Sequence, residues 1–230
     1  WVQFTIEERA SGRIVGDVGL SPATGEPGVI KVGYTVAPGF QRNGFATEAV
    51  ASLIDPATLR WISWSHFEVD ECGALNEWLA AAPNAVPAHG QVGINIWLTD
   101  MANRGPRTLK NDEVLDIGGK KVRWLDTPHV PHNWDAGLIY EETTGTLFSS
   151  DLFTQMGACE ATTTGDIVDA AIATQKAVPF MPATPLAAPT LQRLAALKPA
   201  TVALMHGPSF KGDGGAALTA LATYYANGKP

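Results

Sequence analysis

One nine-residue segment constrains the fold of this chain more than any other feature. Residues 65–73 read Ser-His-Phe-Glu-Val-Asp-Glu-Cys-Gly and follow a predicted strand at 59–63. The segment gathers one imidazole and three carboxylates at a strand end: His66, Glu68, Asp70 and Glu71. Carboxylates this close repel one another unless a cation neutralises them. The segment therefore predicts a metal cluster, with a solvated acidic turn as the alternative.

Three more candidate ligands follow apolar runs elsewhere in the chain. His132 lies in the segment 127–135, Asp151 follows a predicted strand at 146–149, and His206 closes another at 201–205. Each side chain would be presented at the end of a strand, where groups from different strands can converge. A single histidine in such a place is more often structural than a ligand. Several such groups in the same topological position favour a shared metal site.

The rest of the pattern alternates short apolar runs with helical stretches. Strands are predicted at 1–8, 13–20, 29–36, 114–117, 121–125 and 137–141, and helices at 47–53, 74–81, 167–175, 188–197 and 216–226. Strand pairs interleaved with helices predict an α+β sandwich of sheets covered by helices.

From about residue 55 onward the order of candidate ligands resembles the metallo-β-lactamase superfamily. The pattern His66-x-Glu68-x-Asp70 is similar to the flavodiiron and oxygen-binding diiron branch. That branch carries Glu where the hydrolase motif His-x-His-x-Asp-His has its second His. The 19 positions from His132 to Asp151 also suit the diiron branch. The resemblance implies a metallo-β-lactamase-like αββα sandwich with two metal ions in one cleft.

The resemblance also implies a role for each ligand. His66, Glu68 and His132 would hold the first metal ion. Asp70 and His206 would hold the second, and Asp151 would bridge the two.

Two further residues are candidates for the chemistry of the site. Glu71 stands where many members of the superfamily have a second His, as a weak ligand of the second metal or as a group behind the ligands. His129 lies in a Thr-Pro-His sequence and is the alternative to His132 as third histidine. If His132 is the ligand, His129 would orient a ligand or face the substrate. Asp151, His129 and Glu71 are therefore the candidate catalytic residues.

The ligand set favours iron, with manganese and zinc as alternatives, because a carboxylate in place of an imidazole makes the site harder. Two iron ions would bind, sense or reduce O2 or NO, an oxidoreductase-like role. Reduction would need an external electron donor, since no flavodoxin domain is present. Two zinc ions would instead activate water to hydrolyse a small-molecule ester, thioester, lactone or phosphodiester. The third alternative is a fusion that holds its metals poorly and has no activity.

The first 54 residues resemble a different family, the GNAT acetyltransferases. The segment 41–46, Gln-Arg-Asn-Gly-Phe-Ala, fits the loop that holds the coenzyme A pyrophosphate in that family. We expect no acetyltransferase activity, because the elements of an acetyl-acceptor site are missing.

The organisation that follows is a GNAT-like fragment at 1–54 joined to a metal-binding domain at 55–230. Half a GNAT domain cannot bury its own core. We therefore expect a chimera, natural or constructed, in which the β-β-β-α fragment supplies the first strands of the sandwich. The alternative is a fragment that protrudes or mediates a homodimer.

Charge and cysteine content bear on partners and location. The 16 Lys+Arg and 23 Asp+Glu give a net charge of −7 with no basic run, which argues against nucleic acid and anionic membranes as partners. Cys72 and Cys159 form no Cys-x-x-Cys pair and are expected to be reduced, which favours a cytoplasmic protein. His89 lies in a Pro/Ala/Gly segment and is expected to be exposed.

Overall fold

The computed structural model describes residues 2–22, 30–41, 43–157 and 159–228, which divide into two compact units. Unit 1 comprises Trp1–Ile62, Ala74–Pro87 and Ala102–Gly105; unit 2 comprises Ser63–Gly73, Ala88–Met101 and Pro106–Pro230. Arg42, in the loop that resembles a coenzyme A site, lies outside the described residues, as does residue 29 at the start of a predicted strand.

Unit 1 is built on a three-stranded antiparallel sheet with the order β1-β2-β3. Its strands and helices are β1 (Val2–Glu8), β2 (Arg13–Pro22), β3 (Ile30–Val36), α1 (Phe45–Ala51), β4 (Trp61–Ile62) and α3 (Leu75–Ala81). Two short 3-10 turns, Pro38–Phe40 and Pro56–Thr58, separate these elements. Gly16 in β2 faces Val36 of β3. A methyl group there would meet the carbonyl oxygen of Thr35 at 2.1 Å, so this pairing requires glycine.

The three N-terminal strands pair with one another. In the described part of the chain β1, β2 and β3 hydrogen-bond into a sheet of their own and do not join the sheets of the sandwich. Their apolar face is covered within unit 1, where Ile6, Val15 and Val18 cluster with Val50 of α1 and Trp78 of α3. The fragment therefore has a small core of its own, completed by a helix that follows it in sequence.

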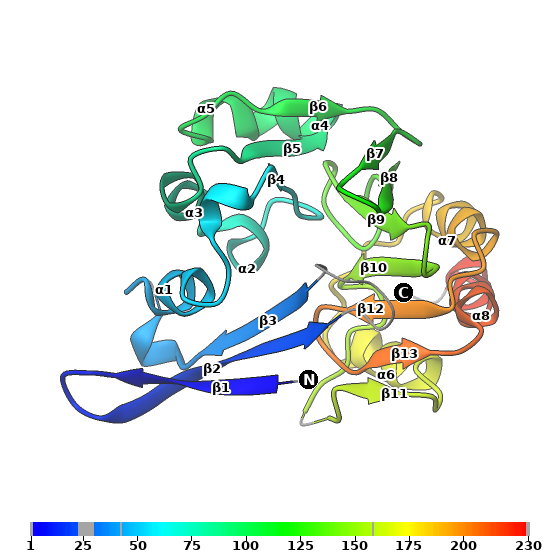
Figure 1. Ribbon diagram of the computed structural model, residues 1–230. Coiled ribbons are helices and arrows are strands. Elements are labelled where there is room, and N and C mark those ends of the chain that lie inside the picture. The colour runs from blue at the N-terminus through cyan, green and yellow to red at the C-terminus, as the bar shows by residue number, and fades with distance from the viewer. Residues whose placement is uncertain (1, 23–29, 42, 158, 229–230) are drawn as a thin grey trace. The chain divides into compact units, whose positions relative to one another are not determined.

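Unit 2 contains a seven-stranded sheet with the order β11-β13-β12-β10-β9-β8-β7. The strands are β7 (Val114–Asp116), β8 (Lys121–Asp126), β9 (Gly137–Glu141), β10 (Thr146–Ser150), β11 (Thr162–Thr163), β12 (Thr201–Leu204) and β13 (Ser209–Lys211). Neighbouring strands are antiparallel except for the parallel pairs β10–β12 and β11–β13. Figure 1 shows β10, β12 and β13 side by side.

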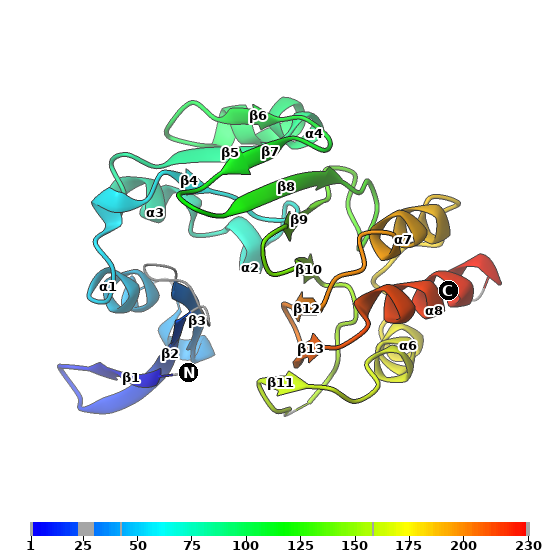
Figure 2. The same ribbon diagram turned by 45° about the vertical axis from the view of Figure 1, so that its right-hand side comes forward.

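Three helices cover one face of this sheet (Figure 2). They are α6 (Val168–Ala177), α7 (Ala187–Ala195) and α8 (Gly214–Ala226). Leu138 and Leu147 of the sheet share one buried cluster with Leu191 of α7 and Leu218 of α8. Burial of each such side chain contributes on the order of 2 kcal/mol, so this layer holds the strands whose ends carry the candidate ligands.

The remaining elements include a stretch for which no element was expected. They are α2 (Val69–Cys72), β5 (Val86–Gly90), α4 (Gln91–Gly93), η3 (Ile94–Leu98), α5 (Thr99–Met101) and β6 (Arg107–Leu109). Strand β5 is parallel to β4 over Val86–Pro87 and to β6 over Ala88–Gly90. The segment η3 is a π-helix, a form found mostly as a short bulge at functional sites. No described helix is both long and apolar enough to cross a bilayer.

Candidate metal centre

The candidate ligands lie where strands end or turn. His66 and Glu68 precede α2, and Asp70 lies within it. His132 lies in the loop between β8 and β9, which contains a cis peptide bond before Pro131. Asp151 directly follows β10, and His206 lies two residues beyond β12. All six belong to unit 2.

Four of these side chains form one tight group. The Nε2 atom of His66 lies 3.0 Å from Glu68 Oε2 and 3.4 Å from Asp151 Oδ2. The Nε2 atom of His132 lies 3.0 Å from Asp151 Oδ2 and 3.3 Å from Glu68 Oε2. Each residue offers one ligand atom, and these four atoms lie within 4.8 Å of one another. Two imidazoles and two carboxylates therefore point at one common position.

The other two side chains form a second group beside the first. His206 Nε2 lies 3.1 Å from Asp70 Oδ2 and 3.5 Å from Asp151 Oδ1. Asp151 thus faces both groups, with Oδ2 toward His66 and His132 and Oδ1 toward His206. A carboxylate in this position can bridge two cations.

Burial divides the two groups. The side chain of His66 is fully buried, that of Asp151 is 9% exposed and that of His132 is 16% exposed. Asp70 and His206 are 48% and 46% exposed. Three of the four side chains around His66 are therefore enclosed by protein, whereas Glu68, which is 48% exposed, and the group around His206 open to solvent.

Electrostatics favour charged groups at the centre. Burial lowers the pKa of His132, but the hydrogen bond with Asp151 and the nearby carboxylates outweigh burial and raise it. Burial also raises the pKa of Asp151, but the hydrogen bond from His132 and the charges of the three histidines lower it overall. The carboxylate of Asp151 is therefore ionised, which is the form that can bind a cation.

Glu71 does not point at the same position as the ligands. Its Oε2 atom accepts a hydrogen bond from the backbone N–H of Ser65 at 3.1 Å, and its Oε1 atom accepts one from the hydroxyl of Ser150. Oε1 also lies 3.9 Å from Nδ1 of His66, on the side of the ring away from the cluster. Of the two roles expected for Glu71, the structure supports the group behind the ligands.

His129 also stays outside the cluster. His129 has a left-handed backbone, with φ of 64°, and its backbone N–H donates to the carbonyl of Asn133 at 2.7 Å. Among the described residues the four-residue group contains His132 and not His129. Of the two histidines, His132 is therefore the one whose side chain lies in the group.

Two residues of the same loop were not expected to contribute. Asp135 is buried, and its Oδ2 atom accepts hydrogen bonds from Phe67 N–H at 3.0 Å and Trp97 Nε1 at 2.8 Å. Asn133 donates to the carbonyl of Phe67 at 3.0 Å and lies 3.2 Å from Nδ1 of His132. Both residues hold the backbone between His66 and Glu68 against the His132 loop. Their position within three residues of His132 is the signal that could have found them.

The expectation that His89 is exposed is wrong. The side chain is fully buried in β5, stacks on Trp64 with ring centroids 5.3 Å apart, and donates from Nε2 to the carbonyl of Ser65 at 3.2 Å. Burial lowers its pKa. His89 is therefore a neutral group that supports the residue preceding His66.

The donor set fits two cations. Within the described residues, Asp151 Oδ1 is a buried carboxylate oxygen that accepts no hydrogen bond. In that part of the chain, the side-chain partners that the structure gives to Glu68, Asp70 and Asp151 include histidines, which can ligate a metal when neutral. A buried carboxylate that lacks a full set of partners is costly, so bound cations would satisfy it.

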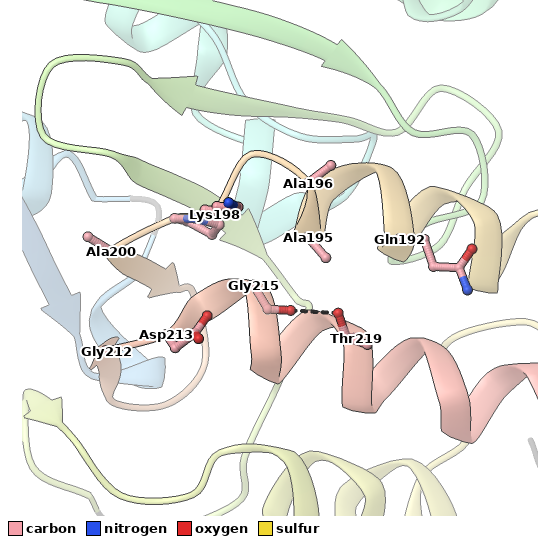
Figure 3. Close-up of a pocket in the computed structure, with 10 residues that line it drawn as sticks. Gln192, Ala195, Ala196, Lys198, Ala200, Gly212, Asp213, Gly215 and Thr219 are labelled. Atoms are coloured by element: carbon pink, nitrogen blue, oxygen red, sulfur yellow. Dashed lines mark hydrogen bonds between the residues drawn. The ribbon is translucent and has the colours of Figure 1, made fainter.

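A cavity of about 680 Å³ lies elsewhere in unit 2, between the end of α7 and the start of α8 (Figure 3). It is lined mostly by small residues, together with Lys198 and Asp213. Asp213 caps α8 by accepting the N–H of Ala216 at 2.8 Å, and Thr219 donates to the carbonyl of Gly215 at 2.8 Å (Figure 3). None of the six candidate ligands lines this cavity, so it is separate from the metal centre.

Two family models match the chain. The ODP family beta lactamase model matches residues 39–207, and the acetyltransferase (GNAT) domain model matches residues 1–75. The predicted join at 54/55 lies in the stretch that both models cover.

Curated relatives match less than half of the chain. The anaerobic nitric oxide reductase flavorubredoxin of Pectobacterium atrosepticum is 32% identical over 118 residues, which are 48% of this chain and 23% of the relative. The chain spans about a fifth of the length of the curated relatives it matches.

Solved structures extend the match in three dimensions. A flavoprotein from Thermotoga maritima superposes with a TM-score of 0.67 at 22% identity, covering 78% of this chain and 46% of that one. A structure described as the peroxy diiron species of the chemotaxis sensor ODP gives a TM-score of 0.62 at 15% identity, covering 96% and 94% of the two chains. At these identities the likeness establishes the fold.

Proposed function

Because the chain belongs to the ODP family of beta lactamases, we propose that it is a dinuclear iron protein that binds, senses or reduces O2 or NO. Both resemblances seen in the sequence are confirmed by the family models, and the metallo-β-lactamase-like α+β fold is confirmed by the solved structures. The finer proposal rests on the geometry of the site and on what the relatives are described as doing.

The observation that carries the proposal is the position of Asp151. One of its oxygens faces His66 and His132, and the other faces His206. His66, Glu68 and His132 would hold the first metal ion, and Asp70 and His206 the second, with Asp151 shared between them. This assignment uses every ligand that the sequence proposes.

The chemistry of the donors favours iron. Three carboxylates and three imidazoles make a mixed oxygen and nitrogen set, which suits iron or manganese better than a set of histidines alone. The relatives point the same way: one is described as a nitric oxide reductase, and one structure is described as a diiron sensor. A bound iron pair would supply the electrons that O2 or NO accepts.

The residues of the chain would set the surroundings of this chemistry. His66 and Asp151 keep water away from one side of the site because they are buried. Asp70 and His206 leave the other side open to solvent, where a small ligand can approach. For reduction, as opposed to sensing, we propose an external electron donor as partner.

The organisation and location of the protein are further parts of the proposal. We retain residues 1–54 as a GNAT-derived fragment without acetyl transfer, and residues 55–230 as the metal-binding domain. An assay with acetyl coenzyme A and varied amines should show no turnover. Cys72 and Cys159 are both free thiols in the structure, which supports a reducing compartment such as the cytoplasm. A homodimer remains the proposed alternative use of the fragment.

Gas binding tests the proposed function. The protein is loaded with ferrous iron without oxygen, and NO or O2 is added while the optical spectrum is recorded. We expect a spectral change that saturates in proportion to bound iron and is lost in Asp151→Ala. A hydrolase would instead leave the iron form unresponsive to either gas and cleave an ester, thioester, lactone or phosphodiester when loaded with zinc. That second result would replace the proposal.

A further inference from the structure

We propose that Glu71 is a positioning residue, which holds the segments of His66 and Asp151 and does not bind metal itself. Without Glu71 as a ligand the two metal positions are unequal, and the position at Asp70 and His206 binds its metal more weakly. This inference rests on the proposed function, because it assumes that the six ligands hold two metal ions. It goes beyond that function in assigning a role to the residue in which this chain departs from its superfamily motif. It also predicts an order in which the two positions fill.

The contacts of Glu71 join the two segments that carry the central ligands. Its side chain is only 8% exposed. One carboxylate oxygen accepts the backbone N–H of Ser65, the residue before His66, and the other accepts the hydroxyl of Ser150, the residue before Asp151. Both hydrogen bonds go to an ionised acceptor, which makes them stronger than bonds between neutral groups. Glu71 therefore holds the chain at His66 and the chain at Asp151 at a set distance from each other.

The segment before Asp151 needs this support. Ser150 has a left-handed backbone, with φ of 49°, which is uncommon for a residue with a side chain. The register of β10 against β12 also shifts between Phe148 and Ser150. This kink turns the chain so that Asp151 leaves the sheet and meets the ligands. The hydrogen bond from Ser150 to Glu71 holds the kinked residue in place.

Glu71 cannot serve as a ligand from the same position. The two ring nitrogens of His66 separate the two functions, because Nε2 faces Glu68 and Asp151 whereas Nδ1 faces Ser65 Oγ at 3.1 Å and Glu71 at 3.9 Å. Successive residues of a helix also point about 100° apart. Asp70 points at His206, so its neighbour Glu71 points elsewhere.

The consequence is an unequal pair of metal positions. The first has four donors, His66, Glu68, His132 and Asp151. The second has Asp70 and His206 and a share of Asp151; both of its own ligands are nearly half exposed, whereas Glu68 is the one ligand of the first position that is comparably exposed. Fewer and more exposed donors bind a cation less tightly. The first position should fill first, and the second should exchange its metal more readily.

A metal titration tests the inequality. The metal-free protein is titrated with Co²⁺, and the visible absorption of the bound ion is followed in the presence of a competing chelator. We expect two phases, with the first equivalent bound roughly tenfold or more tightly than the second. His132→Ala should remove the tight phase, and His206→Ala should remove the weak one.

Two substitutions at Glu71 test its role. Glu71→Ala removes both acceptors and should weaken the tight phase on the order of 10- to 100-fold, as is usual for a group that supports metal ligands. Glu71→Gln keeps an oxygen for Ser65 N–H, and its amide N–H can donate to Ser150 Oγ, so both phases should stay near their original affinities. Glu77→Ala, at an exposed site in α3, is the matched control and should change neither phase.

The possible results separate the inference from the function beneath it. Two phases of equal affinity would overturn the unequal positions while leaving a dinuclear site intact. Loss of the weak phase alone in Glu71→Gln would show that Glu71 is a metal ligand and would overturn its positioning role. Failure to bind any Co²⁺ would overturn the proposed function itself.

Discussion

The hydrogen bonds of Asp135 make the most demanding prediction for a residue outside the metal ligands. Oδ2 of this buried carboxylate accepts both Phe67 N–H and Trp97 Nε1–H. Asp135→Ala leaves these two donors without an acceptor. Each hydrogen bond to a charged group contributes about 1.5–3 kcal/mol, and water can reach the half-buried Trp97 in part, so we expect a loss of about 2–4 kcal/mol in the free energy of unfolding.

The same substitution should reach the metal centre. Phe67 lies between His66 and Glu68, so releasing its backbone loosens two ligands at once. We expect metal affinity at the first position to fall on the order of 10-fold or more. Asp135→Asn keeps an amide oxygen that can accept, and should lose about 1 kcal/mol or less.

Urea denaturation of the metal-free protein, followed by far-UV circular dichroism, measures the stability term, and Co²⁺ titration measures the affinity. Asp100→Ala, at an exposed carboxylate in α5, is the control. If the free energy of unfolding of Asp135→Ala lies within about 0.5 kcal/mol of that of the original protein, the reasoning from buried donors is refuted.

Three further predictions concern stability. Burial lowers the pKa of His89, so below the ordinary pKa of 6.5 the unfolded chain takes up a proton that the folded protein does not. As the pH falls below 6.5, this group should therefore lower the free energy of unfolding by up to about 1.4 kcal/mol per pH unit. His89→Gln should flatten that part of the pH profile in urea denaturation, and an unchanged slope would contradict it. Burial raises the pKa of Glu141, but hydrogen bonds from Thr144 and Thr143 outweigh burial and lower it to about 2. The ionised Glu141 therefore stabilises the fold fully above pH 4.5, and this stabilisation is lost as the pH falls toward 2. Glu141→Gln should lower the free energy of unfolding by about 2 kcal/mol at pH 7 and by progressively less in acid. A loss that does not depend on pH would show that the charge of Glu141 is not the cause. A methyl group at Gly137 would lie 2.0 Å from the Trp124 ring, so Gly137→Ala should lower the free energy of unfolding by about 1–3 kcal/mol. A variant as stable as the original protein would show that the ring can move aside.

The candidate ligands could be proposed from sequence because each follows a local signal. Asp151 comes directly after β10 and His206 comes two residues after β12, and these strands are neighbours in the sheet. Placing a polar group at a strand end needs only the periodicity of that strand. Bringing the ends together needed the family resemblance, since strand order is a long-range property.

The sequence could not predict the direction of side chains, or which strand pairs with one whose own residues show little strand pattern. His89 lies in a strand, Val86–Gly90, that lacks alternation and contains proline. Its burial depends on pairing with β6 and on three tryptophans, of which Trp64 and Trp124 belong to distant segments. Glu71 and Asp70 are adjacent carboxylates on one short helix. Which of them meets His206 is decided by the turn of that helix and by Ser150, far along the chain.

The N-terminal strands illustrate the same limit. Their antiparallel order follows from local hairpins and was predictable from alternating residues and turns. Their cover was not, because Trp78 belongs to a helix beyond the expected end of the fragment. A fragment whose own residues do not form a complete hydrophobic core can therefore complete it with a helix from the next segment of the chain.

Elemental analysis of protein purified without added metal tests the central claim most directly. We predict close to two iron atoms per chain, falling to at most one in His206→Ala and to nearly none in Asp151→Ala, because the second residue belongs to both positions. Zinc in place of iron would contradict the redox function. Iron far below one atom per chain in the original protein would contradict the metal centre itself.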